Sequence, residues 1–127
     1  MNMRHNVGAY RSGLEKKNSE YLKKLKVNFT YEEVKIRYVK PITHHTYTPD
    51  FDLIKSGVIV ETKGMFTVAD RKKHLLIQAQ YPELDIRFVF SNSRAKLYKG
   101  SKTTYGMWCD KNSFRYADKL IPKEWFK

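Results

Sequence analysis

The sequence predicts an α/β fold of the mixed α+β kind, in which helices flank a central mixed β-sheet. Segments with helical and strand-like apolar spacing follow one another in the order α-β-β-β-α-β. Hydrophobic residues make up 41% of the 127 residues, which is enough for one core. No Gly-, Ser- or Pro-rich linker divides the chain, so residues 1–127 are expected to form a single domain.

The first helix is expected over residues 12–26, after a flexible basic arm at residues 1–10. Ser12 and Glu15 have the spacing of a capping box, in which a hydroxyl and a carboxylate satisfy the first free N–H groups of a helix. Leucines then recur near the helical period of 3.6 residues. The helix therefore has an apolar face that a sheet can cover.

Three strands are expected next. Residues 29–39 alternate between apolar and polar side chains apart from one slip, which indicates a bulged strand. Residues 46–54 and 58–62 are expected to form an antiparallel hairpin around Gly57.

The second half continues with a helix capped by Thr67 or Asp70, which stops before Pro82. The strongly apolar residues 86–90 are expected to form a strand near the centre of the sheet. Weaker patterns predict a helix, a short strand and a final turn over residues 103–111, 114–116 and 119–126.

The charge is strongly basic and unevenly placed. Lys and Arg number 25 against 13 Asp and Glu, a net charge of +12. The excess lies in residues 1–26 and 91–127, while the acids gather between them. Such a field recruits a polyanion, and nucleic acid is the commonest one. Charge that only keeps a protein soluble, or that meets an acidic membrane surface, is the alternative interpretation.

The sequence indicates neither export nor membrane insertion. No stretch approaches the ~20 apolar residues of a membrane span, and the N-terminus has no apolar signal region. The single cysteine, Cys109, excludes an internal disulfide and favours a reducing compartment. It also lacks partners at zinc-binding spacing.

Asp50, Glu61 and Lys63 form the central candidate site. Glu61 and Lys63 are two apart on a strand, so their side chains share a face, and the hairpin brings Asp50 level with Glu61. Two carboxylates suit Mg²⁺ or Mn²⁺, and a neighbouring ammonium can stabilise charge on a phosphate oxygen. The pattern indicates metal-assisted phosphodiester hydrolysis. A turn aspartate beside a solvated strand edge is the alternative.

Other charged side chains allow two interpretations each. Glu15 is either a capping partner of Ser12 or a carboxylate that leans into a metal site. Cations that open the second helix oppose its dipole, which indicates a phosphate partner or a solvated face. Neighbouring histidines on an extended segment point opposite ways, so surface or DNA contact is favoured over a shared metal ion. The predicted DNA contacts are Arg4, His5, Arg11, Lys16, His44, His45, Arg71, Lys72, Lys73, His74, Arg94, Lys96 and Lys99.

Eight ordered blocks of the sequence together resemble the phage endonuclease I family of Holliday-junction resolvases. The blocks are Arg11-Ser-Gly-Leu-Glu15, Tyr31-Glu-Glu33, His45-Thr-Tyr-Thr-Pro-Asp-Phe51, Val60-Glu-Thr-Lys-Gly64, Asp70-Arg-Lys-Lys-His-Leu-Leu-Ile77, Pro82-Glu-Leu-Asp-Ile-Arg87, Lys96-Leu-Tyr-Lys-Gly-Ser101 and Ala117-Asp-Lys-Leu-Ile-Pro122. They cover nearly the whole chain, although the family often has a longer basic C-terminal tail.

The resemblance implies a restriction-endonuclease-like core with a P-D…(D/E)-x-K motif, in a homodimer that exchanges its N-terminal helix and first strand. The bridge between subunits would fall near residues 37–46. Glu15, Asp50 and Glu61, with the Thr62 carbonyl, would bind two Mg²⁺ or Mn²⁺ ions, and Lys63 would be the catalytic lysine. No small-molecule cofactor is expected.

The implied activity is hydrolysis of four-way and other branched DNA near the branch point, in the cytoplasm of an infected bacterium. Two alternatives stay open. One is a non-catalytic basic DNA-binding protein, and the other is a restriction- or repair-type nuclease with the same core.

Overall fold

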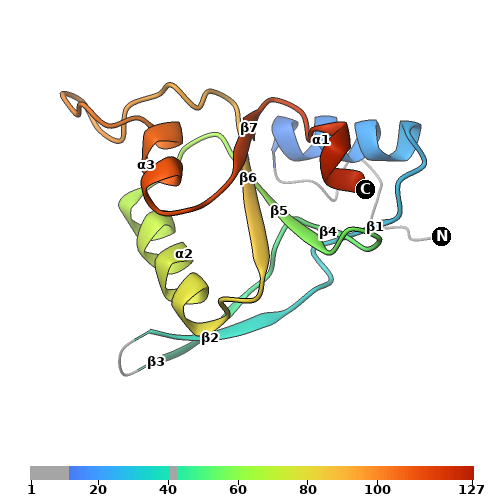
Figure 1. The fold of residues 1–127 in the computed structure, drawn as a ribbon, viewed down its shortest axis with the longest axis horizontal. Coiled ribbons are helices and arrows are strands. Elements are labelled where there is room, and N and C mark those ends of the chain that lie inside the picture. The colour runs from blue at the N-terminus through green and yellow to red at the C-terminus, as the bar shows by residue number, and fades with distance from the viewer. Residues whose placement is uncertain (1–11, 41–42) are drawn as a thin grey trace.

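The computed structural model describes residues 12–40 and 43–127 (Figure 1). The expected arm at residues 1–10, with Arg4 and His5, lies outside the described residues, and so does Arg11. A five-stranded sheet runs through the centre of the molecule. Its strands, in spatial order, are β1 (Phe29–Tyr31), β4 (Phe51–Leu53), β5 (Val58–Lys63), β6 (Asp85–Phe90) and β7 (Tyr116–Asp118). The β1–β4 and β4–β5 pairs are antiparallel, whereas the β5–β6 and β6–β7 pairs are parallel, so the predicted mixed sheet is confirmed.

Helices cover both faces of this sheet (Figure 1). One face packs with α2 (Val68–Gln80) and α3 (Tyr105–Lys111), the other with α1 (Gly13–Lys24) and a 3₁₀ turn at Lys123–Phe126. Successive residues of β5 alternate between the two cores, as Ile59 and Val60 do. A strand buried on both faces has continuously apolar sequence, which explains the runs in β5 and β6.

The expected bulged strand at residues 29–39 is broken in two, which corrects the prediction. β1 ends at Tyr31, Glu32 adopts a φ of 54°, and the chain continues as β2 (Ile36–Lys40). Left-handed backbone interrupts the pleat of a strand, so the slip in alternation marks a break instead of a bulge. β2 pairs with β3 (Thr43–Tyr47) in a separate two-stranded sheet.

The predicted strand at residues 46–54 is divided in the same way. β3 ends at Tyr47 and β4 begins at Phe51. Pro49 lies between them and has no N–H to donate to a ladder. In the described part of the segment where the bridge between subunits was expected, β2 pairs with β3 in antiparallel register. The Gln80 side chain ties β2 to α2 by bonds to the N–H and C=O of Val39 at 2.7 and 2.6 Å.

The helix starts follow the predicted capping chemistry. The Ser12 hydroxyl accepts from the N–H of Glu15 at 3.1 Å, and Thr67 forms a complete capping box with Asp70. The helix expected over residues 103–111 begins at Tyr105, and the strand expected over residues 114–116 is β7, which covers Tyr116–Asp118. Across the described ranges, the helices are too short and too polar to span a bilayer.

Candidate active site

Asp50 is anchored to the carboxyl end of β5. Its Oδ2 accepts hydrogen bonds from the Thr62 N–H at 2.9 Å and from the Thr62 hydroxyl at 2.8 Å. The antiparallel pairing of β4 with β5 places Phe51 opposite Val60, which brings the preceding aspartate beside Thr62. The Asp50 side chain is 6% exposed. The hairpin therefore brings Asp50 to the Glu61–Lys63 segment, as expected from the spacing.

Glu61 and Lys63 share one face of β5, where Lys63 Nζ lies 3.6 Å from Glu61 Oε2. The ammonium also donates to Asp70 Oδ1 at 3.1 Å. Asp70 thus has two tasks, since its other oxygen accepts from the Thr67 N–H at the start of α2. The sequence predicts Asp70 only as a helix cap, and the spacing between Lys63 and Asp70 does not predict their contact.

The Glu15 side chain reaches the same region from the first turn of α1. The Tyr31 hydroxyl donates a hydrogen bond to its carboxylate. Carboxylate oxygens of Glu15, Glu32 and Asp50 lie within 4.8 Å of one another. The capping and site interpretations of Glu15 are compatible, because the backbone N–H serves the cap while the carboxylate joins the acidic cluster.

Glu32 is a member of this cluster that the sequence analysis did not select. The N–H of Glu32 donates to the Asp50 carbonyl at 3.2 Å, which fixes the end of β1 beside the start of β4. The slip in apolar alternation after Tyr31 was the available signal. It was interpreted as a bulge, although it marks the point where a carboxylate enters the cluster.

Tyr47 positions Glu61, whose carboxylate is the fourth at the site after those of Glu15, Glu32 and Asp50. Its hydroxyl donates to Glu61 Oε1 at 2.9 Å, and the ring is buried. Burial, and then the charge of Glu61, keep the pKa of Tyr47 well above its usual value, so the phenol stays protonated as a donor. The sequence analysis also missed this residue, because an alternating strand needs aromatic side chains for its core whether or not they serve a site.

Burial dominates the electrostatics of the acidic residues. It raises the pKa of Asp50 well above the usual value, and the nearby charges of Glu61 and Glu15 add to this despite the two Thr62 hydrogen bonds. Burial also raises the pKa of Glu61 against the opposing effects of Lys63 and Tyr47. Holding these groups ionised together is costly, and a bound cation removes that cost.

Lys63 is held in its charged form. Burial lowers the pKa of its ammonium, but the carboxylates of Glu61 and Asp70 outweigh burial and the net shift is upward. A lysine with a raised pKa cannot serve as a general base near neutral pH. It can donate hydrogen bonds and positive charge to a developing oxyanion.

The donor set fits a hard divalent cation. Carboxylate oxygens from three different segments converge in the Glu15, Glu32 and Asp50 cluster, with Glu61 close enough to raise the pKa of Asp50. Oxygen-only ligands suit Mg²⁺ and Mn²⁺. Thr62 was expected to contribute its carbonyl, and in the structure its N–H and hydroxyl orient Asp50.

Two predicted DNA contacts are corrected by burial. The His74 ring is 0% exposed and packs edge-on against Tyr47, Phe88 and Phe114. Burial, followed by the charge of Lys73, lowers the pKa of His74 to about 3, so the ring is neutral. Arg71 is 9% exposed and donates to the Phe66 carbonyl at 2.6 Å. Both side chains face the core side of α2, a distinction that a run of four basic residues does not reveal.

The other described members of the predicted DNA-contact set reach solvent. Lys16 and Lys73 are partly exposed, and Lys73 Nζ lies 5.4 Å from the centre of the Tyr47 ring. The exposed members are His44, His45, Lys72, Arg94, Lys96 and Lys99. His44 and His45 lie on β3, opposite Val39 and Tyr38, away from the acidic cluster.

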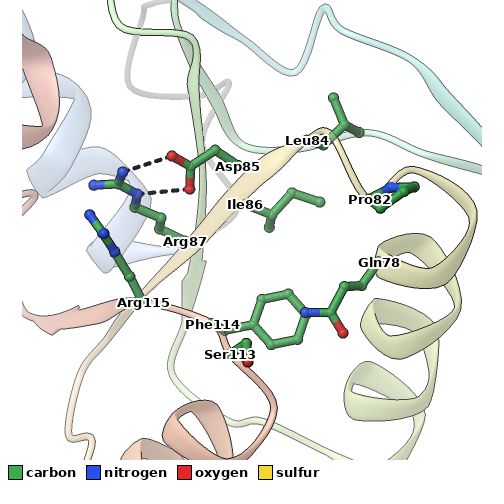
Figure 2. Close-up of a pocket in the computed structure, with 9 residues that line it drawn as sticks. All are labelled: Gln78, Pro82, Leu84, Asp85, Ile86, Arg87, Ser113, Phe114 and Arg115. Atoms are coloured by element: carbon green, nitrogen blue, oxygen red, sulfur yellow. Dashed lines mark hydrogen bonds and ion pairs between the residues drawn. The ribbon is translucent and has the colours of Figure 1, made fainter.

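A separate cavity of about 360 Å³ lies at the amino-terminal end of β6 (Figure 2). Arg87 pairs there with Asp85 at 2.7 Å, and Arg115 and Phe114 complete the same wall. None of the carboxylates of the acidic cluster lines it. The acidic cluster and Lys63 at the carboxyl end of β5 are therefore the candidate active site.

A largely buried acidic cluster beside a lysine, on a mixed sheet in a basic protein, is an arrangement that metal-assisted hydrolysis of a phosphodiester can use. The Phage endonuclease I family matches residues 1–127. Endonuclease I of Escherichia phage T7 is 60% identical over 121 residues, which are 95% of this chain and 80% of that protein. Endodeoxyribonuclease 1 of Enterobacteria phage T3 is 58% identical over 114 residues, 90% of this chain and 74% of that protein. The chain belongs to the phage endonuclease I family, so the resemblance seen in the eight blocks is confirmed.

Proposed function

We propose that this chain is a metal-dependent DNA endonuclease that cuts four-way and other branched DNA near the branch point. One observation carries the proposal, namely that the carboxylates of Glu15, Glu32 and Asp50 converge beside the Glu61–Lys63 ion pair at the end of β5. Its two named relatives support the nuclease activity, and the net charge of +12 supports a polyanionic substrate. The proposed place of action is the cytoplasm of the infected bacterium.

Glu15, Asp50 and Glu61, with the Thr62 carbonyl, would hold two Mg²⁺ or Mn²⁺ ions. When bound, these ions lower the pKa of an attacking water and neutralise charge on the phosphate and on the leaving oxygen. Thr62 keeps Asp50 in place through two hydrogen bonds. Lys63, held by Asp70, would donate to a non-bridging phosphate oxygen as negative charge builds there.

We also propose that two chains exchange α1 and β1 across the segment at residues 37–46. The site divides at the β2–β3 hairpin, because Glu15 and Tyr31 precede it whereas Asp50, Glu61 and Lys63 follow it. Opening the hairpin toward a partner would preserve the same contacts between two chains, which is the usual basis of domain exchange. Each site would then contain carboxylates from both subunits.

The experiment is cleavage and binding of a fixed four-way junction by single variants. Asp50→Ala, Glu61→Ala and Lys63→Ala should each lower cleavage by at least about 10³-fold, because they remove groups that act on the transition state. Junction binding in EDTA should stay near wild type. Lys55→Ala, an exposed change in the β4–β5 turn, is the matched control. If each of the three single variants still cleaved the junction at the wild-type rate, the assignment of Asp50, Glu61 and Lys63 as catalytic residues would be wrong.

Two further arms separate the alternatives. Cleavage that requires Mg²⁺ and stops in EDTA excludes a non-catalytic binding protein, and equal cleavage of linear duplex would favour a restriction- or repair-type nuclease. Mixing an inactive Glu15→Ala chain with an inactive Asp50→Ala chain tests the exchange, because only a composite site restores activity. If activity does not return although the subunits are shown to have mixed, the proposed exchange is wrong.

A further inference from the structure

Two adjoining cavities form one groove between α1 and the loops that follow β6 and β7. The first, of about 430 Å³, is lined by Gly13, Leu14, Lys17, Ser91 and Lys119. The second, of about 460 Å³, is lined by Ser91, Asn92, Arg94, Asp118 and Lys119. They share Ser91 and Lys119, so the two cavities lie side by side. We call this feature the α1–β7 groove.

A buried asparagine holds the two walls of the groove together. Asn18 of α1 is 0% exposed, and its amide donates to the Lys119 carbonyl at 3.0 Å and accepts from the Ile121 N–H at 3.0 Å. The same amide also donates to the Leu14 carbonyl at 3.1 Å. Because these bonds satisfy the buried amide on both sides, they fix the distance between α1 and the chain after β7.

The groove lies beside the candidate active site. The N–H of Ser91 donates to the Lys63 carbonyl at 3.1 Å, so the loop after β6, which lines the groove, is held next to the end of β5. On the opposite wall, Gly13, Leu14 and Lys17 line the groove from the face of α1 turned away from the buried Glu15 side chain. A chain molecule whose reacting bond lies at Lys63 would therefore continue past the loop after β6 into this groove.

The lining of the groove is suited to phosphates. Lys17, Arg94 and Lys119 are exposed cations, against a single carboxylate, Asp118. That carboxylate is occupied, since it accepts from the N–H and the hydroxyl of Ser93 at 2.6 and 2.7 Å. The lining residues that the structure describes include no aromatic ring on which a base would stack. Such a surface contacts the backbone and does not read bases.

We propose that the α1–β7 groove binds the sugar–phosphate backbone of the strand being cut, directly beside the scissile phosphodiester. This inference rests on the proposed function, because it requires a DNA strand at Lys63. It assigns roles to Lys17 and Lys119, neither of which is among the DNA contacts predicted from the sequence. In an exchanged dimer, Lys17 would come from one chain and Lys119 from the other.

The first test measures junction binding in EDTA over a range of salt concentrations. Lys17→Gln and Lys119→Gln should each weaken binding several-fold at low salt and reduce the salt slope by about one. Lys55→Gln removes the same charge from the β4–β5 turn, at the other end of β5, and should leave the slope unchanged. Lys119→Arg, which keeps the charge, should restore it. The Asn18 bonds use backbone atoms of Lys119, so these variants should fold, and thermal unfolding checks this.

The second test locates the contact on the DNA. Neutral methylphosphonates are placed one at a time at the three phosphates on each side of the mapped cleavage position. At one position, neutralisation should weaken binding of the wild type but have no further effect on Lys119→Gln. Additive effects at every position would overturn the proposal, as would groove variants that behave like Lys55→Gln.

The outcomes also distinguish this inference from the proposed function. A wild-type chain that binds and cuts the junction, with groove variants equal to the control, overturns the groove alone. A wild-type chain that neither binds nor cuts branched DNA overturns both.

Discussion

Replacing Tyr47 with phenylalanine isolates the hydrogen bond that orients Glu61. The substitution removes one hydroxyl that donates to Glu61 Oε1 at 2.9 Å. The ring stays, and with it the packing against His74 at 5.0 Å and the position of Lys73 Nζ at 5.4 Å from the ring centre. Any change in metal binding therefore reports on the orientation of one carboxylate.

The size of the effect follows from the kind of bond that is lost. Hydrogen bonds to charged groups contribute about 1.5–3 kcal/mol, and loss of a partner behind a metal ligand typically costs ~10–100-fold in metal affinity or activity. Tyr47 also lowers the pKa of Glu61, so its hydroxyl opposes protonation of that carboxylate. We expect Tyr47→Phe to bind Mn²⁺ about 10–100-fold more weakly, with the midpoint of metal binding shifted to higher pH.

The assay is calorimetric titration of the metal-free protein with Mn²⁺ at several pH values, alongside kcat and KM for junction cleavage. Tyr38→Phe is the matched control, since Tyr38 is a buried tyrosine on the neighbouring strand β2 and its ring lies 5.7 Å from that of His45 in a tilted arrangement. A positioning role predicts a lower kcat with little change in KM. Equal Mn²⁺ affinity and an identical pH profile in Tyr47→Phe and wild type would refute the reasoning.

Two further predictions concern stability and pH. Because burial raises the pKa of Asp50, the folded metal-free protein holds this proton at pH values where the unfolded chain has released it, and stability is lost as the pH rises through that window. Asp50→Asn should therefore raise the free energy of unfolding in EDTA at pH 8, by about 1.4 kcal/mol for each tenfold by which folding increases the proton affinity of Asp50, and the Tm should rise with it. The gain should be smaller at pH 5. A lower Tm for Asp50→Asn at pH 8 would contradict the burial argument. His74 has the opposite sign, because its folded pKa of about 3 lies below the unfolded value, so stability is lost as the pH falls below about 6.5. His74→Phe should remove about 2 kcal/mol of the loss between pH 7 and pH 5 in urea unfolding, without changing junction affinity, and an unchanged pH dependence would show that the ring titrates normally.

The sequence by itself determined the features that depend on short separations along the chain. Ser12 and Thr67 start helices through bonds to residues three positions away. The joining of Asp50 to Thr62 follows from one hairpin, whose apolar pattern defines its register. The sequence also predicts the strands β5 and β6, because a strand that is buried on both faces needs apolar side chains on both.

Only the tertiary structure decided which segments meet. The donation from Tyr31 to Glu15, the entry of Glu32 into the acidic cluster and the bond of Asn18 to Lys119 join residues on separate elements. It also decided that His74 is buried while its neighbour Lys72 is exposed, since a basic run looks alike on either face of a helix. Periodicity specifies which residues share a face of one element. What covers that face depends on how all the elements pack, and this packing sets the burial and hydrogen bonding on which the chemistry of the site rests.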